Sequence, residues 1–184
     1  MTIALTGPRN PVPQAERDAH VRSCQEKVIQ RLSTDPDRAV TTSTMSGTVG
    51  DGVACTVTQG RHSAVMDMGP AMGGEERGPS PGFFARAGIV GCVAIALKLA
   101  AAREGLTFRS VDIDLETTSD DLAIFGLGGG RAAPLETRIT IHIDTDEPDD
   151  SVSDLIERVL EMDTWFLALR DPQNVSVAWQ TGSD

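Results

Sequence analysis

The chain has 184 residues, of which 40% are apolar and 23% are charged, enough to bury the core of one domain or of one domain with an extension. Lys and Arg total 16 against 27 Asp and Glu, which gives a formal net charge of −11. Because nucleic acids are bound through basic surfaces, this balance argues against a nucleic-acid partner.

The cysteines indicate the redox environment. Cys24, Cys55 and Cys92 are widely spaced and form no CxxC pair, which argues against a zinc knuckle or a thioredoxin-type motif. Their odd number, with an N-terminus that lacks the features of a secretory leader, predicts reduced thiols in the cytoplasm. The longest apolar run, Ala87 to Leu97, is too short to span a bilayer, so no membrane partner is expected.

The first forty residues predict an appendage. Residues 1–13 contain three prolines and predict an extended arm, and a narrow apolar stripe predicts a helix from Gln14 to about Leu32. A helix with so narrow an apolar face is expected to lie on a larger body. We therefore divide the chain into an N-terminal arm and helix, 1–40, and a main domain, 41–184.

Three short strands are expected next. Thr41 to Val49, Val53 to Thr58 and His62 to Met66 are separated by the turn signals Gly50-Asp51-Gly52 and Gln59-Gly60, which predicts a three-stranded meander. A loop rich in Gly and Pro follows, from Met68 to Pro79.

A long apolar helix is the strongest prediction from the pattern. Ser80 is placed to cap it, Pro81 to occupy its first position and Gly105 to end it after Glu104. The helix is apolar nearly all round, broken only by Arg86 and Lys98, so other elements must wrap it. One small chain with few aromatic residues would cover it incompletely, which predicts a partner subunit.

The last third of the chain predicts an α+β arrangement. Val111 to Leu115 and Ile139 to Ile143 alternate apolar and polar residues, as strands with one buried face do. Ser151 to Asp154 resembles a capping box and predicts the start of a helix, a second helical piece spans Trp165 to Leu169, and Val175, Val177 and Trp179 predict a final strand. The predicted order is three strands, a helix, two strands, two helices and one strand.

Several motifs carry little functional signal. The tract Gly126 to Gly130 has Arg131 where a phosphate-binding frame needs glycine, so a flexible loop is the better interpretation. His20, His62 and His142 have no metal-ligand spacing, and no cofactor or metal is expected. The acidic cluster Asp146 to Asp150 compensates a helix dipole, with weak cation binding as the alternative.

The segments around Cys92 resemble the OsmC/Ohr family. The resemblance rests on Gly73-Gly74, on Gly78-Pro79-Ser80-Pro81, on the apolar run from Ala87 to Cys92 and on the element order, and it covers Thr41 to Trp179. It implies an OsmC-like α+β fold and an intertwined homodimer whose central helices are buried between two sheets. It also implies reduction of organic hydroperoxides: a reactive thiolate becomes a sulfenic acid, which a second cysteine resolves. In that family an Arg stabilises the thiolate and a Glu positions the Arg.

Carried over by residue, the resemblance is incomplete. Cys92 holds the place of the reactive cysteine, but the Glu position is Gly82. The position of the second cysteine falls at Asp163, or at Thr164 if the register slips by one. The Arg falls at Met72 in one branch of the family, with Arg77 nearby as a candidate. Cys55 would be a substitute resolver if its strand face points at Cys92.

These differences leave three hypotheses. The first is a thiol peroxidase that acts through Cys92, has weak or lost activity and is reduced by an external thiol. The second is a non-catalytic dimer that binds a small apolar ligand. The third is a purely structural or regulatory dimer. If Asp163 lies beside Cys92, its charge should raise the pKa of the thiol and slow its reactions. In the alternative, Asp163 faces solvent and has no effect.

Overall fold

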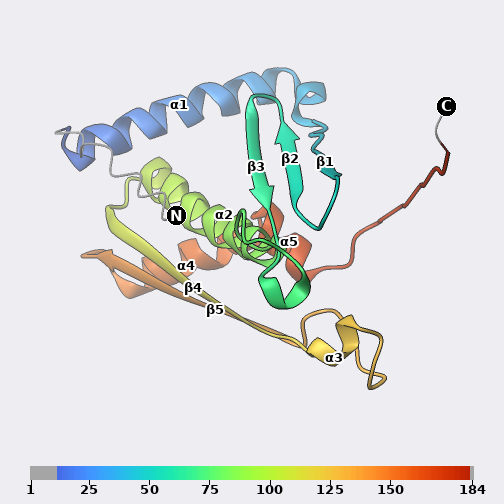
Figure 1. The fold of residues 1–184 in the computed structure, drawn as a ribbon. Coiled ribbons are helices and arrows are strands. Elements are labelled where there is room, and N and C mark those ends of the chain that lie inside the picture. The colour runs from blue at the N-terminus through green and yellow to red at the C-terminus, as the bar shows by residue number, and fades with distance from the viewer. Residues whose placement is uncertain (1–11, 183–184) are drawn as a thin grey trace.

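The computed structural model describes residues 12–182 and confirms the α+β class. A long helix, α1 (Gln14–Thr34), lies across one side of the molecule and is followed by a short 3₁₀ turn, η1 (Pro36–Ala39). The small sheet and helix α2 lie below α1, and a long two-stranded ribbon lies beyond α2 (Figure 1). The arm predicted for residues 1–13 falls almost entirely outside the described residues.

The predicted meander is present. Strands β1 (Ser46–Val49), β2 (Cys55–Gln59) and β3 (His62–Met66) form an antiparallel sheet in the order β1-β2-β3. All of β1 is exposed and only alternate residues of β2 and β3 are partly buried. This sheet therefore contributes little to the core of its own chain.

The loop after β3 is held by one buried carboxylate. Asp67, which is 3% exposed, accepts hydrogen bonds from the backbone N–H groups of Met68, Glu75 and Arg77 at 2.8, 3.1 and 3.0 Å. The loop includes the 3₁₀ turn η2 (Pro70–Met72). Gly78 is required here because a Cβ atom at this residue would lie 2.1 Å from the carbonyl oxygen of Val65. The glycines before α2 thus let two backbone segments approach closely.

Helix α2 (Pro81–Glu104) begins and ends where the sequence predicts. The side chain of Ser80 accepts a hydrogen bond from the N–H of Phe83 at 3.3 Å, and Gly105 ends the helix with a φ of 84°. All of its buried residues lie in the C-terminal half: Val93, Leu97, Ala100, Ala101 and Ala102. Only part of this apolar helix is therefore covered by its own chain.

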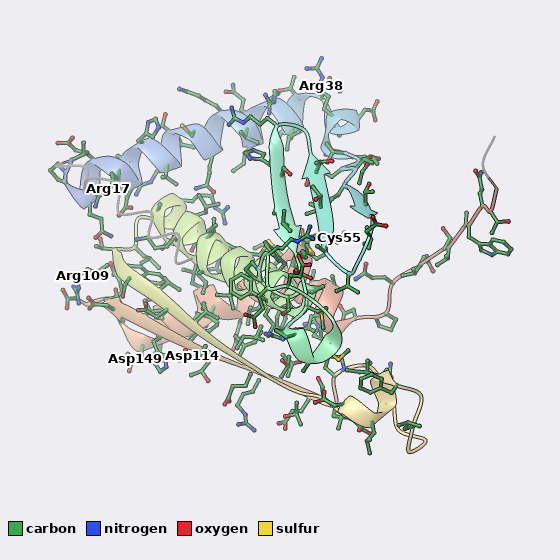
Figure 2. The ribbon with its side chains drawn as sticks, viewed as in Figure 1. Arg17, Arg38, Cys55, Arg109, Asp114 and Asp149 are labelled. Atoms are coloured by element: carbon green, nitrogen blue, oxygen red, sulfur yellow. The ribbon has the colours of Figure 1, made fainter. Side chains whose placement is uncertain are left out.

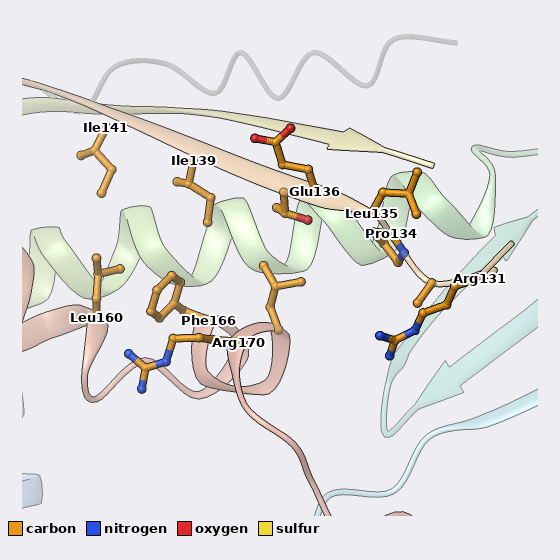
Figure 3. A pocket seen from close by; sticks show the side chains of 12 residues that line it. Arg131, Pro134, Leu135, Glu136, Ile139, Ile141, Leu160, Phe166 and Arg170 are labelled. Atoms are coloured by element: carbon orange, nitrogen blue, oxygen red, sulfur yellow. The ribbon is translucent and has the colours of Figure 1, made fainter. Parts of the chain in front are cut away.

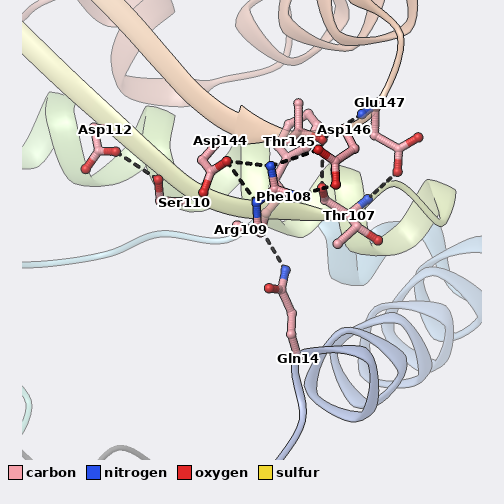
Figure 4. A network of polar contacts seen from close by, with 10 residues as sticks. All are labelled: Gln14, Thr107, Phe108, Arg109, Ser110, Asp112, Asp144, Thr145, Asp146 and Glu147. Atoms are coloured by element: carbon pink, nitrogen blue, oxygen red, sulfur yellow. Dashed lines mark hydrogen bonds and ion pairs between the residues drawn. The ribbon is translucent and has the colours of Figure 1, made fainter.

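The two long strands form an antiparallel ribbon against α2. In β4 (Phe108–Thr118) and β5 (Glu136–Thr145), Val111 faces Ile143 and Ile113 faces Ile141 on the half-buried side. At the start of β4, Arg109 forms ion pairs with Asp144 and Asp146, and Gln14 of α1 donates to the Phe108 carbonyl at 2.7 Å (Figure 4).

The core lies where α2, β4 and the next helix, α4 (Asp149–Leu160), meet. Its fully buried side chains are aliphatic apart from one phenylalanine, and the largest are Val93, Leu97, Phe108 and Leu155. The amphipathic α4 supplies its buried face, as the spacing of its apolar residues predicts.

Three details differ from the sequence predictions. Helix α4 begins at Asp149 after Pro148, without a side-chain cap, so the capping box predicted from Ser151 is wrong; Pro148 already sets an extended φ and ψ ahead of the first turn. A short helix, α3 (Asp121–Ile124), was not predicted; its cap Asp120 accepts a hydrogen bond from the N–H of Leu122.

The predicted final strand is also absent. After helix α5 (Thr164–Arg170), the chain runs away from the body of the molecule (Figure 1). Val175, Val177 and Trp179 are 80%, 84% and 80% exposed, and no strand is formed. A strand needs a neighbouring sheet edge, and this segment does not reach either sheet of its own chain.

Helix α1 is attached mainly through polar side chains. Arg22 and Gln25 donate to the carbonyls of Ala102 and Leu99 in the last turns of α2, at 2.7 and 2.9 Å, and none of the helix's residues is fully buried. The carbonyl of Ala102 is one of the four that the end of a helix leaves free, so the bond from Arg22 satisfies it. The division at residue 40 stays a prediction, since the structure gives no boundary between separate units.

By length and composition α2 could cross a membrane. The core helices of soluble proteins pass the same test, and the C-terminal half of α2 packs against β4 and α4.

Candidate functional site

Cys92 lies near the middle of α2 and is half-buried. On the same stripe of the helix, the residues three, four, seven and eight positions before it line an apolar cavity of about 410 Å³: Ile89, Gly88, Ala85 and Phe84. Helix α5 forms the opposite wall through Trp165, Ala168 and Leu169. Cys92 thus lies on the α2 stripe that lines this apolar cavity, one turn beyond Ile89 and Gly88, and the N–H of the lining residue Trp165 acts on its thiol.

Asp163 is the residue that α5 brings to this site. It is 3% exposed and caps α5: its Oδ1 accepts hydrogen bonds from the N–H groups of Trp165 and Phe166 at 3.1 and 2.8 Å. Its other oxygen, Oδ2, is buried without a hydrogen-bond partner. The cap fixes the carboxylate, so its free oxygen cannot turn away.

The surroundings of Cys92 favour the neutral thiol. Burial raises the pKa of Cys92, and the nearby Asp163 carboxylate raises it further, while the N–H of Trp165 acts in the opposite direction. Asp163 is itself buried, so the alternative in which it faces solvent is wrong. Thr164 is the first residue of α5, and which of the two residues matches the family's second cysteine stays a prediction.

The candidate Arg77 is engaged elsewhere. Its guanidinium pairs with Glu75 at 2.8 Å, its side chain is 56% exposed, and it is not among the groups that shift the pKa of Cys92. Met72, in η2, is 46% exposed and brings no charge. No arginine among residues 12–182 contributes to the pKa of this thiol.

Gly82, which the resemblance places at the Glu position, is close to Arg86, which was not among the predicted site residues. A Cβ atom at Gly82 would lie 3.3 Å from Nη1 of Arg86, one turn further along α2. The helical spacing of the two residues was the available signal.

The other cysteines are not bonded to Cys92. All three are free thiols, and Cys24 is exposed on α1, 3.6 Å from His20. Cys55 lies at the end of β2 remote from Arg38 (Figure 2), and its sulfur faces Gly47 of β1. Its suggested role as a resolver stays a prediction.

A second cavity, of about 600 Å³, was not predicted. It lies between the half-buried face of β5 and helix α5, where Phe166 and Arg170 face Ile139 and Ile141 (Figure 3). Arg170 forms ion pairs with Glu161 and Asp171, which neutralise much of its charge. This cavity shares helix α5 with the Cys92 site.

No metal centre is formed by the described part of the chain, where no three His, Cys, Asp or Glu side chains are grouped as ligands. In the acidic cluster 146–150, Asp146 pairs with Arg109, and Glu147 accepts a hydrogen bond from the N–H of Thr107.

The glycine tract before β5 forms turns. Positive φ values of 70°, 73° and 70° occur at Gly126, Gly128 and Gly129. The tract does not lead into the start of a helix, which a phosphate-binding loop would need.

Comparison with known proteins agrees with this fold. The family model for OsmC-like proteins matches residues 73–177, more than half of the chain, whereas no curated protein sequence matches significantly. An OsmC-like protein from Mycoplasma pneumoniae is similar in structure, with a TM-score of 0.60, 12% identity and coverage of 71% of this chain and 88% of that one.

Two hydroperoxide resistance proteins are also similar in fold. The one from Legionella pneumophila has a TM-score of 0.54 and 18% identity, covering 71% of this chain and 90% of that chain. The one from Elizabethkingia anophelis has a TM-score of 0.51 and 17% identity, covering 71% and 89%. With the family model spanning α2, both long strands, α4 and α5, the chain belongs to the OsmC-like protein family.

Proposed function

We propose that this protein is an oxidative-stress protein in which Cys92 reacts slowly with organic hydroperoxides. The supporting observation is that Cys92 lies on the same stripe of α2 as the residues that line the apolar cavity between α2 and α5, a cavity that suits the organic group of such a peroxide. The sulfur attacks the outer peroxide oxygen, the O–O bond breaks, and the products are a sulfenic acid and an alcohol.

The missing second cysteine determines how the site is restored. Asp163 stands where a resolving thiol would be needed, so the sulfenic acid must be reduced by an external thiol. That thiol attacks the sulfur and releases water, and a second thiol reduces the resulting mixed disulfide. Because the neutral form of Cys92 is favoured, we expect weak turnover.

We also propose a homodimer in the cytoplasm, where the three cysteines remain reduced. Phe83 and Ile95 on α2 are 50% and 61% exposed, and an added Cβ at Gly88 or Gly91 would meet nothing within 4 Å. A second copy of the chain would cover this apolar surface, and its sheet edge would accept the exposed segment Val175–Trp179.

The test is to trap the sulfenic acid. The protein is treated with cumene hydroperoxide or hydrogen peroxide, dimedone is added, and the adduct is located by mass spectrometry. We expect the adduct on Cys92, faster with the organic peroxide, and no peroxide consumption by Cys92→Ser. Cys55→Ser is the matched control, and equal activity of the Cys92→Ser variant would contradict the proposal.

The second candidate function is binding of a small apolar ligand without turnover. It is favoured by the raised pKa of Cys92, which keeps the thiol unreactive beside an apolar cavity. Trp165 lines this cavity, so quenching of its fluorescence by an apolar probe, in a Trp179→Phe background, would report binding. Binding together with no dimedone adduct would favour this function over the first.

A further inference from the structure

Only one of the two carboxylate oxygens of Asp163 has a structural role. Oδ1 caps α5 through two backbone N–H groups, and Oδ2 is the one buried side-chain polar atom that lacks a partner in the described part of the chain. A buried carboxylate oxygen without a donor is destabilising, so its retention calls for an explanation beyond capping. Ser, Thr or Asn would cap the helix equally well.

The group that Asp163 acts on is the Cys92 thiol. Asp163 is buried at the start of α5, which packs against α2, and its carboxylate raises the pKa of the thiol. Oδ2 makes no hydrogen bond of its own. Contacts between catalytic groups often form only when substrate binds. Oδ2 is therefore the oxygen that is available to accept a proton from the sulfur.

We propose that Asp163 is a catalytic residue that accepts the proton of Cys92 and returns it to the leaving alcohol. This inference rests on the proposed reaction of Cys92 with organic hydroperoxides. As the sulfur attacks the outer oxygen, its proton passes to Oδ2 while the O–O bond breaks. The resulting carboxylic acid then protonates the departing alkoxide. The sulfenic acid keeps the hydrogen of the outer oxygen, and Asp163 returns to its ionised form.

The chemistry explains why a carboxylate serves here. A neutral thiol is a poor nucleophile, so a base that removes its proton during the attack replaces the missing arginine. An alkoxide is a poor leaving group unless it is protonated, and the same residue supplies that proton. Positioned acid–base groups typically contribute about 10²–10⁴-fold to a rate.

The test compares two reactions of the same sulfur in a Cys24→Ser, Cys55→Ser background. Alkylation by iodoacetamide needs a thiolate but no proton for the leaving iodide, whereas oxidation by cumene hydroperoxide needs both. In Asp163→Asn, which keeps the cap, we expect faster alkylation but oxidation slower by about tenfold or more. Asp171→Asn removes a charge from the other end of α5 and should change neither rate.

The outcomes separate the two levels of inference. If Asp163→Asn accelerates both alkylation and oxidation, Asp163 only lowers the fraction of Cys92 that is ionised. The catalytic role of Asp163 is then overturned, while the proposed reaction of Cys92 with hydroperoxides stands. If the unaltered Cys92 forms no sulfenic acid, both are overturned. Asp163→Ser also retains a capping oxygen and should behave as the Asn variant does, so the comparison does not depend on the folding of one variant.

Discussion

The Asp163 carboxylate, at the N-terminus of α5, raises the pKa of the Cys92 thiol in the middle of α2. The two residues are far apart in sequence, and they meet because α5 packs against α2 beside an apolar cavity. Burial acts on the pKa in the same direction, so the site favours a protonated thiol at neutral pH.

The pH dependence of alkylation should report this relationship directly. In the single-cysteine protein, the rate should rise at higher pH than for an ordinary thiol. In Asp163→Asn the profile should move to lower pH, since the repelling charge is gone while burial remains. The rate of Cys92 alkylation by iodoacetamide is measured at each pH by quenching the reaction and determining the modified fraction by mass spectrometry. Identical pH profiles for the wild-type residue and Asp163→Asn would contradict the role of Asp163.

Mild peroxide treatment should produce no disulfide within one chain. The resemblance places no second cysteine beside Cys92, and neither Cys24 nor Cys55 is bonded to it. Thiol blocking followed by peptide mass spectrometry should find Cys92 as a sulfenic acid or its further oxidation products. A bridge from Cys92 to Cys55 would restore the paired-thiol mechanism.

The exposed segment after α5 should be required for dimerisation. Replacement of Val177, which is 84% exposed, by Asp should shift the protein toward monomer in light scattering at micromolar concentration. A charge on the apolar side of an intermolecular strand would be buried without a partner. Ser176→Asp, on the other side of the segment, is the control. A stable, folded wild-type monomer would refute the dimer.

The carboxylate of Asp67 should contribute to acid stability. Its pKa is lowered mainly by the backbone N–H of Arg77, together with those of Met68 and Glu75. The stabilisation is therefore fully present above the pKa of the unfolded chain and is lost as pH falls through the lower folded pKa. Urea unfolding across acidic pH should show a smaller loss for Asp67→Asn than for wild type. Asp51→Asn, at an exposed turn residue, should follow the wild-type curve.

Phe108 should dominate the stability of the core. It is fully buried among Leu97, Leu155 and their neighbours, so Phe108→Ala should lower the free energy of unfolding by about 3–5 kcal/mol. Phe125 is 60% exposed, and its replacement by Ala should cost no more than about 0.5 kcal/mol. Urea titration of both variants gives the comparison; equal losses would contradict the position of the core.

Local signals in the sequence determined most of the elements. The caps of α2 at Ser80 and Gly105 and the alternation of β4 and β5 are encoded by neighbouring residues, so they could be predicted without the fold. The resemblance also directed attention to Cys92, whose role stays a prediction. The start of α4 was misplaced because Pro148 outweighs a weak cap signal.

Only the tertiary structure decided which of these residues act on one another. The sequence left open whether Asp163 faces solvent or Cys92, and it left Arg77 as a candidate. The fold buries Asp163, whose carboxylate acts on the Cys92 thiol, and the loop after β3 directs Arg77 to Glu75. The segment Val175–Trp179 has the alternation of a strand but forms none here. Alternation sets which side chains share a face, whereas hydrogen bonding in a sheet depends on an edge that another part of the assembly must supply.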